Sequence, residues 1–329
     1  MWFPGEVECA NGAAPQAGDI LRPFNTVVGN LRNGDDLLTL AFAIDDEGRP
    51  DSIDWASGSE RTLADAPAAL AGSRFEAGMP AEDCRISYRA STATVEQAPF
   101  AELVSLSISP DGPRPPREVW DRVYGSTECA KAPRPQQLVT VMPEFAKIPS
   151  NPGARAWTLI GFDINEDGET RAVRVVISTG NDTLDDAGLT AISESRFSSG
   201  TPKSGCRYPY WRNPVRLPAP EKPQSDGSCE GLPDWDFPPV LRYPEAFERR
   251  LIEGWAVVRY DVASWGETGN VEVVDAQPAS AFGTAAEMMI RRAKYEADGK
   301  GATNCTTLVS YVLPDERGLL DQSGDNQSD

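Results

Sequence analysis

The sequence predicts an α+β protein built from three tandem small modules, each containing a short helix, a hairpin, a second helix and a final strand. Three observations lead to this fold class. Six cysteines fall into three pairs of nearly equal spacing, an acidic turn with a glycine follows the first cysteine of each pair, and a basic-aromatic pair precedes the second. Landmarks that recur at a fixed period are typical of tandem copies of one unit.

The cysteines set the period of the repeat. Six cysteines allow fifteen pairings, and one pairing closes three loops of 75, 77 and 76 residues, namely Cys9–Cys84, Cys129–Cys206 and Cys229–Cys305. We expect these three disulfides inside the modules, and therefore an oxidising compartment. The alternative interpretation is six unrelated buried thiols.

Two further landmarks keep the same spacing. The turns DDEGRP, NEDGET and SWGETG place a glycine 39, 39 and 37 residues after the first cysteine, at Gly48, Gly168 and Gly266. Basic-aromatic pairs follow at Arg74-Phe75, Arg196-Phe197 and Lys294-Tyr295. We expect each aromatic ring to close the core where the helix meets the last strand, with the basic residue near the helix C-terminus. A repeated ligand site is the alternative.

The elements of each module follow in order. The runs LLTLAFAID, AWTLIGFDIN and WAVVRYDVA precede the turns, and DSIDWAS, RAVRVVIST and NVEVVDA follow them. Acidic residues and glycine between two such runs predict a hairpin. In the third module an apolar helix face recurs every three or four residues, at Phe282, Ala286, Met289 and Ala293. In the first module Pro67 must lie in the opening turn of a shorter helix.

These landmarks divide the chain into modules and linkers. We expect modules at residues 1–98, 129–217 and 229–316, a lead-in at 99–128, a linker at 218–228 and a disordered tail at 317–329. The segments SPDGPRPPRE and PAPEKPQSDGS are polar and proline-rich, which is typical of semi-rigid spacers. The tail DQSGDNQSD has the polar composition of a disordered segment.

Composition excludes several classes of function. The formal charge of −19 and the lack of a basic face argue against a nucleic-acid partner. The chain has no histidine, which removes Ser-His-Asp catalysis and every histidine-ligated metal. No run approaches the roughly 18 apolar residues of a membrane helix, and the first ten residues do not resemble a signal peptide. We therefore expect a mature, exported form whose signal peptide has been removed.

The C-terminal part contains a series of landmarks in a fixed order. They are Tyr243-Pro244, Gly254-Trp255, VVRYDV, the Gly266 turn, NVEVVDAQP, Phe282, RRAKYE and VSYVL, between residues 243 and 313. Together they resemble the C-terminal domain of TonB-family proteins. The second module shares MPEFA, the GFDINEDGETRAVRVV hairpin and SRF, and the first shares its hairpin, SRF and last strand.

The resemblance implies a three-stranded antiparallel sheet packed against one or two helices, and a periplasmic interaction domain with no enzymatic activity. Such domains bind an extended segment, the TonB box, of outer-membrane TonB-dependent transporters. The strong negative charge, the three copies and the absence of a long Pro-Lys spanning segment favour an exported binding protein over an energy transducer. The expected partner is such a transporter or another envelope protein. A scaffold whose modules cover each other's edges is the alternative, and a carboxylate enzyme using Asp45, Asp46 and Glu47 is the third hypothesis.

The strand after the second cysteine lies at a sheet edge in the family, and an open edge can accept an added strand. The second module has Pro209 and Pro214 there, and the first has two arginines, Arg85 and Arg89. The third has neither proline nor charge from residue 306 to 313. We expect the peptide-binding edge there, at Thr306, Thr307, Leu308, Val309, Ser310, Tyr311 and Val312, unless another module covers it.

One segment could hold a metal ion. Asp163, Asn165, Asp167 and Gly168 match the start of an EF-hand loop, but its twelfth position is Arg174 instead of a bidentate glutamate. We interpret the segment as a hairpin turn, and we expect no metal, cofactor or catalytic residue.

Overall fold

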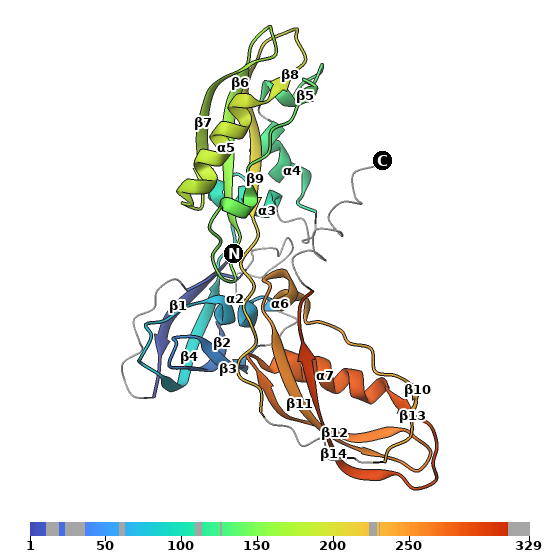
Figure 1. Ribbon diagram of the computed structural model, residues 1–329. Coiled ribbons are helices and arrows are strands. Elements are labelled where there is room, and N and C mark those ends of the chain that lie inside the picture. Colours follow the sequence, from blue (N-terminus) through green and yellow to red (C-terminus); the bar gives the residue numbers. More distant parts are fainter. Residues whose placement is uncertain are drawn as a thin grey trace. The chain divides into compact units, whose positions relative to one another are not determined.

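The computed structural model describes residues 1–10, 20–23, 37–58, 63–108, 114–125, 127–223, 229 and 231–314. The expected disordered tail at 317–329 lies outside these residues. The described part is an α+β protein whose sheets are small and antiparallel, as the sequence predicts. The chain separates into two compact units (Figure 1). The middle unit contains Arg89–Val215, and the composite unit contains Leu37–Tyr88 together with the chain from Arg216 onward.

The first sheet has the strand order β1-β4-β2-β3. Its elements are β1 (Trp2–Glu8), β2 (Leu37–Ile44), β3 (Pro50–Ser57), helix α2 (Ala66–Gly72) and β4 (Ala81–Ala90). Pro67 lies in the first turn of α2, where its missing N–H costs nothing. Every residue of α2 is buried. The fourth strand, β1, is an addition to the three strands that the sequence predicts.

The second sheet has the order β7-β6-β9, with a two-stranded sheet β5-β8 beside it. Its elements are β5 (Gln137–Val139), the 3-10 helix η3 (Phe145–Lys147), β6 (Ala156–Ile164), β7 (Thr170–Ser178), α5 (Asp182–Glu194), β8 (Arg196–Phe197) and β9 (Lys203–Arg212). The side-chain amide oxygen of Asn181 accepts the N–H of Leu184 at 3.0 Å and so starts α5.

The second sheet is covered on both faces, and this explains why the central strand β6 is almost continuously buried. One core contains Ile160 and Phe162 with Leu184 and Ile192 of α5. The other contains Trp157 and Leu159 with residues of the lead-in. The lead-in forms α3 (Phe100–Ser107), α4 (Arg117–Trp120), η1 (Asp121–Gly125) and η2 (Glu128–Ala130). Because side chains alternate between the faces of a strand, β6 contributes side chains to both cores.

The third sheet has the order β12-β11-β14, with a two-stranded sheet β10-β13. Its elements are β10 (Trp235–Phe237), α6 (Glu245–Arg249), β11 (Gly254–Val262), β12 (Thr268–Gln277), α7 (Ser280–Arg292), β13 (Lys294–Tyr295) and β14 (Ala302–Tyr311). Phe282 of α7 is fully buried and packs edge-on against Phe247 and Tyr311. Two arginines in the last turn of α7 complement the helix dipole.

The same corner occurs in all three sheets. The N–H of Phe75, Phe197 and Tyr295 donates to the carbonyl of the hairpin glycine at 2.9, 2.8 and 2.8 Å. These glycines, Gly48, Gly168 and Gly266, have φ angles of +73°, +81° and +91°, and a Cβ on them would lie 2.3, 2.0 and 1.9 Å from the carbonyl oxygen of the same aromatic residue. Only glycine fits such a contact. The aromatic rings are buried, which confirms their expected role in the core.

The basic residue of each pair behaves as expected in two cases. Arg74 donates to the carbonyls of Ala71 and Ser73 at the end of α2, and Arg196 does the same with Ser193 and Ser195 after α5. Lys294 differs, because its ammonium group pairs with Asp236 of β10 at 2.9 Å.

Three disulfides close the loops that the spacing predicts, at Cys9–Cys84, Cys129–Cys206 and Cys229–Cys305. Over the described residues, none of the helices has the length and apolar character to cross a membrane.

The composite unit joins the first and third sheets. Ile53 of β3 forms a parallel bridge with Ala279, and its N–H donates to Pro278 at 3.0 Å. A buried ion pair adds to this contact, because the guanidinium of Arg250 binds the carboxylate of Asp65 through two hydrogen bonds of 2.9 and 2.5 Å. Neither residue belongs to a motif that predicts this contact.

Candidate functional site

The expected peptide-binding strand lies at the edge of the third sheet. β14 pairs with β11 in an antiparallel register that runs from Gly254 opposite Tyr311 to Val262 opposite Ala302. No strand among the described residues pairs with its other side. An edge of this kind presents a row of N–H and C=O groups to an incoming strand.

The direction of the N–H groups along β14 follows from its C-terminal end. The N–H of Leu313 donates to the carboxylate of Glu253, which directly precedes β11, at 3.0 Å. Because successive N–H groups of a strand point to opposite sides, those of Tyr311 and Val309 also face β11. The N–H groups of Ser310 and Leu308 therefore face outward. The second sheet agrees, because Trp211 has the position of Ser310 on β9 and also points its main-chain groups away from β6, as described below.

The side chains of β14 divide between its two faces. Val309 and Tyr311 are buried against the α7 side, whereas Leu308 and Ser310 are half-buried and Val312 is exposed. An added strand would thus meet outward main-chain groups flanked by small or apolar side chains. This combination permits main-chain recognition with selectivity from alternate side chains.

A bulge ends the pairing at the other end of β14. Asn304 has a φ angle of +56°, and the register between β11 and β14 shifts at this point. The carboxylate of Asp261 accepts from the Asn270 amide at 2.7 Å and from the Asn304 N–H at 2.8 Å. These two hydrogen bonds lower the pKa of Asp261. The bulge leaves the stretch from Cys305 to Tyr311 as the regular part of the edge.

The corresponding strand of the first sheet is not an edge. The expectation that β4 ends its sheet is wrong, because β1 pairs along its other side in the order β1-β4-β2-β3. Its arginines, Arg85 and Arg89, are therefore not what blocks this edge. A peptide therefore cannot pair with β4, and β1 takes the edge position of this sheet among the described strands.

The corresponding strand of the second sheet, β9, is an edge with a defect. Trp157 of β6 exchanges hydrogen bonds with Thr179 beyond β7, so its main-chain groups face away from β9. Its partner Trp211 on β9 therefore faces outward, and so does Pro209 two residues earlier. Proline has no N–H, so this edge lacks a donor where an added strand needs one.

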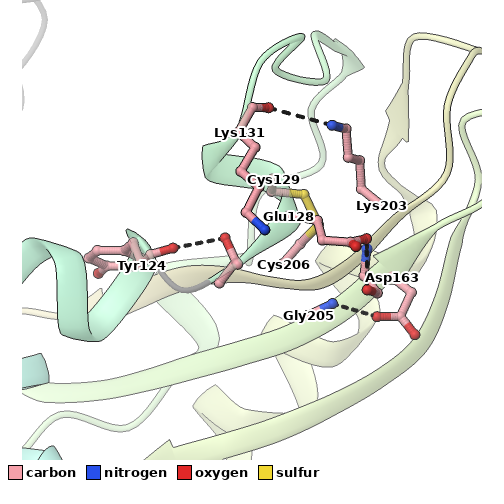
Figure 2. The surroundings of a disulfide bond; sticks show 10 residues. Tyr124, Glu128, Cys129, Lys131, Asp163, Lys203, Gly205 and Cys206 are labelled. Carbon is pink, nitrogen blue, oxygen red and sulfur yellow. Dashed lines mark hydrogen bonds between the residues drawn. A yellow bond between two sulfur atoms is a disulfide. The ribbon is translucent and has the colours of Figure 1, made fainter.

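The lead-in also lies along β9. Cys129 of η2 is bonded to Cys206 of β9 (Figure 2). Beside this bond, the N–H and hydroxyl of Ser204 both donate to the carboxylate of Glu128 at 2.8 Å, and these hydrogen bonds lower the pKa of Glu128. On the neighbouring strand, Asp163 accepts the N–H of Gly205 at 2.7 Å. Figure 2 shows η2 beside β9, to which the disulfide and Glu128 attach it.

The acidic turns have structural roles. The carboxylate of Asp45 accepts the N–H groups of Glu47 and Arg49 and binds the Arg49 guanidinium at 2.7 Å. In the second hairpin Asn165 accepts the N–H groups of Asp167 and Glu169 in the same way. Over the described part of the chain, no cluster of three potential metal-ligating side chains occurs. These contacts show that Asp45 and Asn165 stabilise the hairpin turns.

The third sheet, the helix α7 that covers it and the edge strand β14 form a small α+β domain with one open edge at β14 among the described strands. Residues 239–313 match the family model of the Gram-negative bacterial TonB protein C-terminal, so this segment is a TonB C-terminal-type domain. The comparison with curated proteins found no match. The domain type indicates a TonB-like role in protein interaction at the cell envelope.

Proposed function

We propose that this chain is an exported periplasmic protein that captures extended peptide segments as an added strand on β14. The binding residues are Thr306, Thr307, Leu308, Val309, Ser310, Tyr311 and Val312. The TonB box of an outer-membrane TonB-dependent transporter is the proposed ligand, and the match of residues 239–313 supports that choice.

The observation that carries the proposal is the difference between three equivalent strands. β4 is covered by β1, and β9 carries Pro209 at an outward position. Of these three strands, as far as the chain is described, β14 alone combines an edge position with neither proline nor charge from residue 306 to 313. Main-chain hydrogen bonds along such an edge are the source of affinity in strand addition.

The periplasmic location and the tandem arrangement belong to the same proposal. Three disulfides favour an oxidising compartment. The recurring corner between the hairpin glycine and the aromatic residue supports an origin of residues 1–98, 129–217 and 229–316 as three copies of one module.

A scaffold is the second candidate, and one observation favours it. The contacts of Ile53 with the segment after β12, together with the Asp65–Arg250 pair, tie the first and third sheets into one unit. A scaffold of this kind would bind no free peptide. The two candidates therefore separate on whether the purified chain captures an extended peptide.

The test compares two proline substitutions on adjacent residues of β14. Ser310→Pro removes an outward N–H, so we expect it to keep the fold and to abolish binding of synthetic ten-residue TonB-box peptides, measured by fluorescence anisotropy. Val309→Pro removes an N–H that faces β11, so we expect it to destabilise the sheet itself. Circular dichroism provides the control for folding.

Two results would reject this proposal. One is normal peptide binding by a folded Ser310→Pro variant. The other is binding that maps to β9, shown by crosslinks from the peptide to residues of the second sheet. Failure of the wild-type chain to bind any TonB-box peptide would favour the scaffold.

A further inference from the structure

The middle unit contains a cavity that the strand-addition proposal does not use. It has a volume of about 790 Å³, which lies within the range of roughly 300–1,000 Å³ that is usual for small-ligand sites. The lead-in forms one wall with Trp120 and Tyr124, and β9 forms the other with Tyr208 and Trp211. The cavity thus lies beside the strand whose edge is interrupted by proline.

The aromatic side chains of this cavity are only partly buried. Trp120 is 43% exposed and Trp211 is 37% exposed, although both are large apolar side chains. The rings of Trp120 and Tyr124 stack with centroids 5.3 Å apart. Partly exposed flat rings on both walls offer stacking surfaces for another planar group.

The charge of the cavity is opposite to that of the chain. Two arginines, Arg134 and Arg207, line it, and none of its lining residues in the described part of the chain is acidic, although the chain has 50 acidic and 31 basic residues. Nη1 of Arg207 donates to the carbonyl of Val123 at 2.5 Å, and the guanidinium lies over the ring of Phe100. Burial lowers the pKa of Arg207.

Both arginines have N–H donors that no described residue accepts. A guanidinium has five N–H donors. The described partners of Arg207 are main-chain carbonyls at Nη1 and the Phe100 ring, and Arg134 donates only from Nε, to the carbonyl of Ala130 at 3.4 Å. Neither arginine forms an ion pair with a carboxylate in the described part of the chain. Two cations without carboxylate partners create a local preference for an anion.

We propose that this cavity binds an aromatic carboxylate, with the ring stacked between the two aromatic walls and the carboxylate held by Arg134 and Arg207. The carboxylate can belong to a free small molecule or to the C-terminal aromatic residue of a polypeptide, since both present the same chemistry. The site is independent of peptide capture on β14, because its residues belong to the middle unit and β14 belongs to the composite unit.

The first experiment titrates the full chain with N-acetyl-phenylalanine and with N-acetyl-phenylalaninamide by isothermal calorimetry. The amide keeps the ring and loses the charge. Charge-assisted hydrogen bonds of an arginine with a carboxylate account for about tenfold or more in affinity, so the amide should bind at least about tenfold more weakly. A peptide ending in phenylalanine, compared as free acid and as C-terminal amide, shows whether the site accepts a chain end or only a small ligand.

Matched variants locate the binding. Arg134→Gln and Trp120→Ala should each weaken N-acetyl-phenylalanine binding about tenfold or more. Arg117→Gln is the control, because Arg117 is a highly exposed arginine on the same helix as Trp120 and does not line the cavity. Ser310→Pro should leave this binding unchanged while it abolishes peptide capture on β14, so the two proposals fail separately.

Three outcomes would overturn the inference. These are equal affinity for the acid and the amide, equal effects of Arg134→Gln and Arg117→Gln, and no heat of binding with N-acetyl-phenylalanine at millimolar concentration. Circular dichroism of each variant tests whether the fold is retained, and Arg134 is a suitable target because its side chain makes one long hydrogen bond within the described residues.

Discussion

Removal of one partner from the Asp65–Arg250 ion pair is expected to destabilise the composite unit and to leave the middle unit unchanged. Both side chains are almost fully buried, with relative exposures of 6% and 1%. Arg250 binds both carboxylate oxygens of Asp65 and also donates to the carbonyl of Arg22 at 3.0 Å. Asp65 precedes α2, but its side chain makes no capping hydrogen bond, so Asp65→Ala tests the ion pair and not a cap.

The magnitude follows from the burial. Loss of one partner removes the paired charge from a buried site, and this costs about 3–5 kcal/mol in comparable pairs. Folded domains have total stabilities of about 5–15 kcal/mol, so the loss is a large fraction of the total. Arg250→Met should cost a similar amount. The double variant should cost less than the sum of the two, because no isolated charge remains.

Native-state hydrogen exchange followed by mass spectrometry is the suitable assay, since it reports on each unit separately. Peptides from β2, β3 and β11 report on the composite unit, and peptides from β6 and β9 are the internal control. The effect should persist at 0.5 M salt, because a buried pair is screened far less than a surface pair.

If Asp65→Ala lowers the protection of the composite unit against hydrogen exchange by less than about 1 kcal/mol, the ion pair does not have this role. Strictly additive effects in the double variant would contradict this role as well, since additivity means that the two side chains do not interact. Equal loss in β6 and β9 would show that the substitution acts on the whole chain.

Three further predictions concern stability. The Cys229→Ser/Cys305→Ser variant should lose up to about 4.5 kcal/mol, an upper value from chain entropy, and the wild type should show no free thiol when it is denatured without reductant. Gly266→Ala should cost at least about 2 kcal/mol in urea unfolding, because its φ is +91° and its Cβ would meet a carbonyl oxygen at 1.9 Å, whereas Gly269→Ala has no atom within 4 Å and should cost far less. Hydrogen bonds from Ser204 lower the pKa of Glu128 in the folded state, so the carboxylate contributes stability above a pH of about 4.5 and loses it as the pH falls through the folded-state pKa. Glu128→Ala should therefore lower the melting temperature more at pH 7 than at pH 3, and an equal decrease at both values would contradict this.

Much of each sheet was predictable, because the relevant signals are local in sequence. The hairpin around Gly168 shows a turn between two apolar runs, and the helix after it shows an apolar period of three to four residues. The contact between the hairpin glycine and Phe197 spans 29 residues, but the spacing recurs in all three copies and so was visible.

The remaining features depend on contacts that leave no local pattern. β1 has the sequence WFPGEVE, whose proline and glycine are not typical of a strand, and its partner β4 lies far along the chain. Arg250 stands in the charged run FERR, which is typical of an exposed helix face, and its partner Asp65 is 185 residues away. The aromatic cavity also combines residues of the lead-in with residues of β9, which the sequence does not connect.

The three strands that follow the second cysteine differ in how their edges are protected, and this difference bears on function. An exposed strand edge promotes aggregation, so folded proteins usually cover it or interrupt it. This chain covers β4 with β1, and it places Pro209 and the disulfide-bonded η2 along β9. β14 has the same position in its sheet, and over the described residues it has neither a covering strand nor a proline within it. Of the three strands that follow the second cysteine, β14 is the one whose edge stays open over the described residues, and this is what we expect if β14 binds a partner, because a covered β14 could not accept a strand.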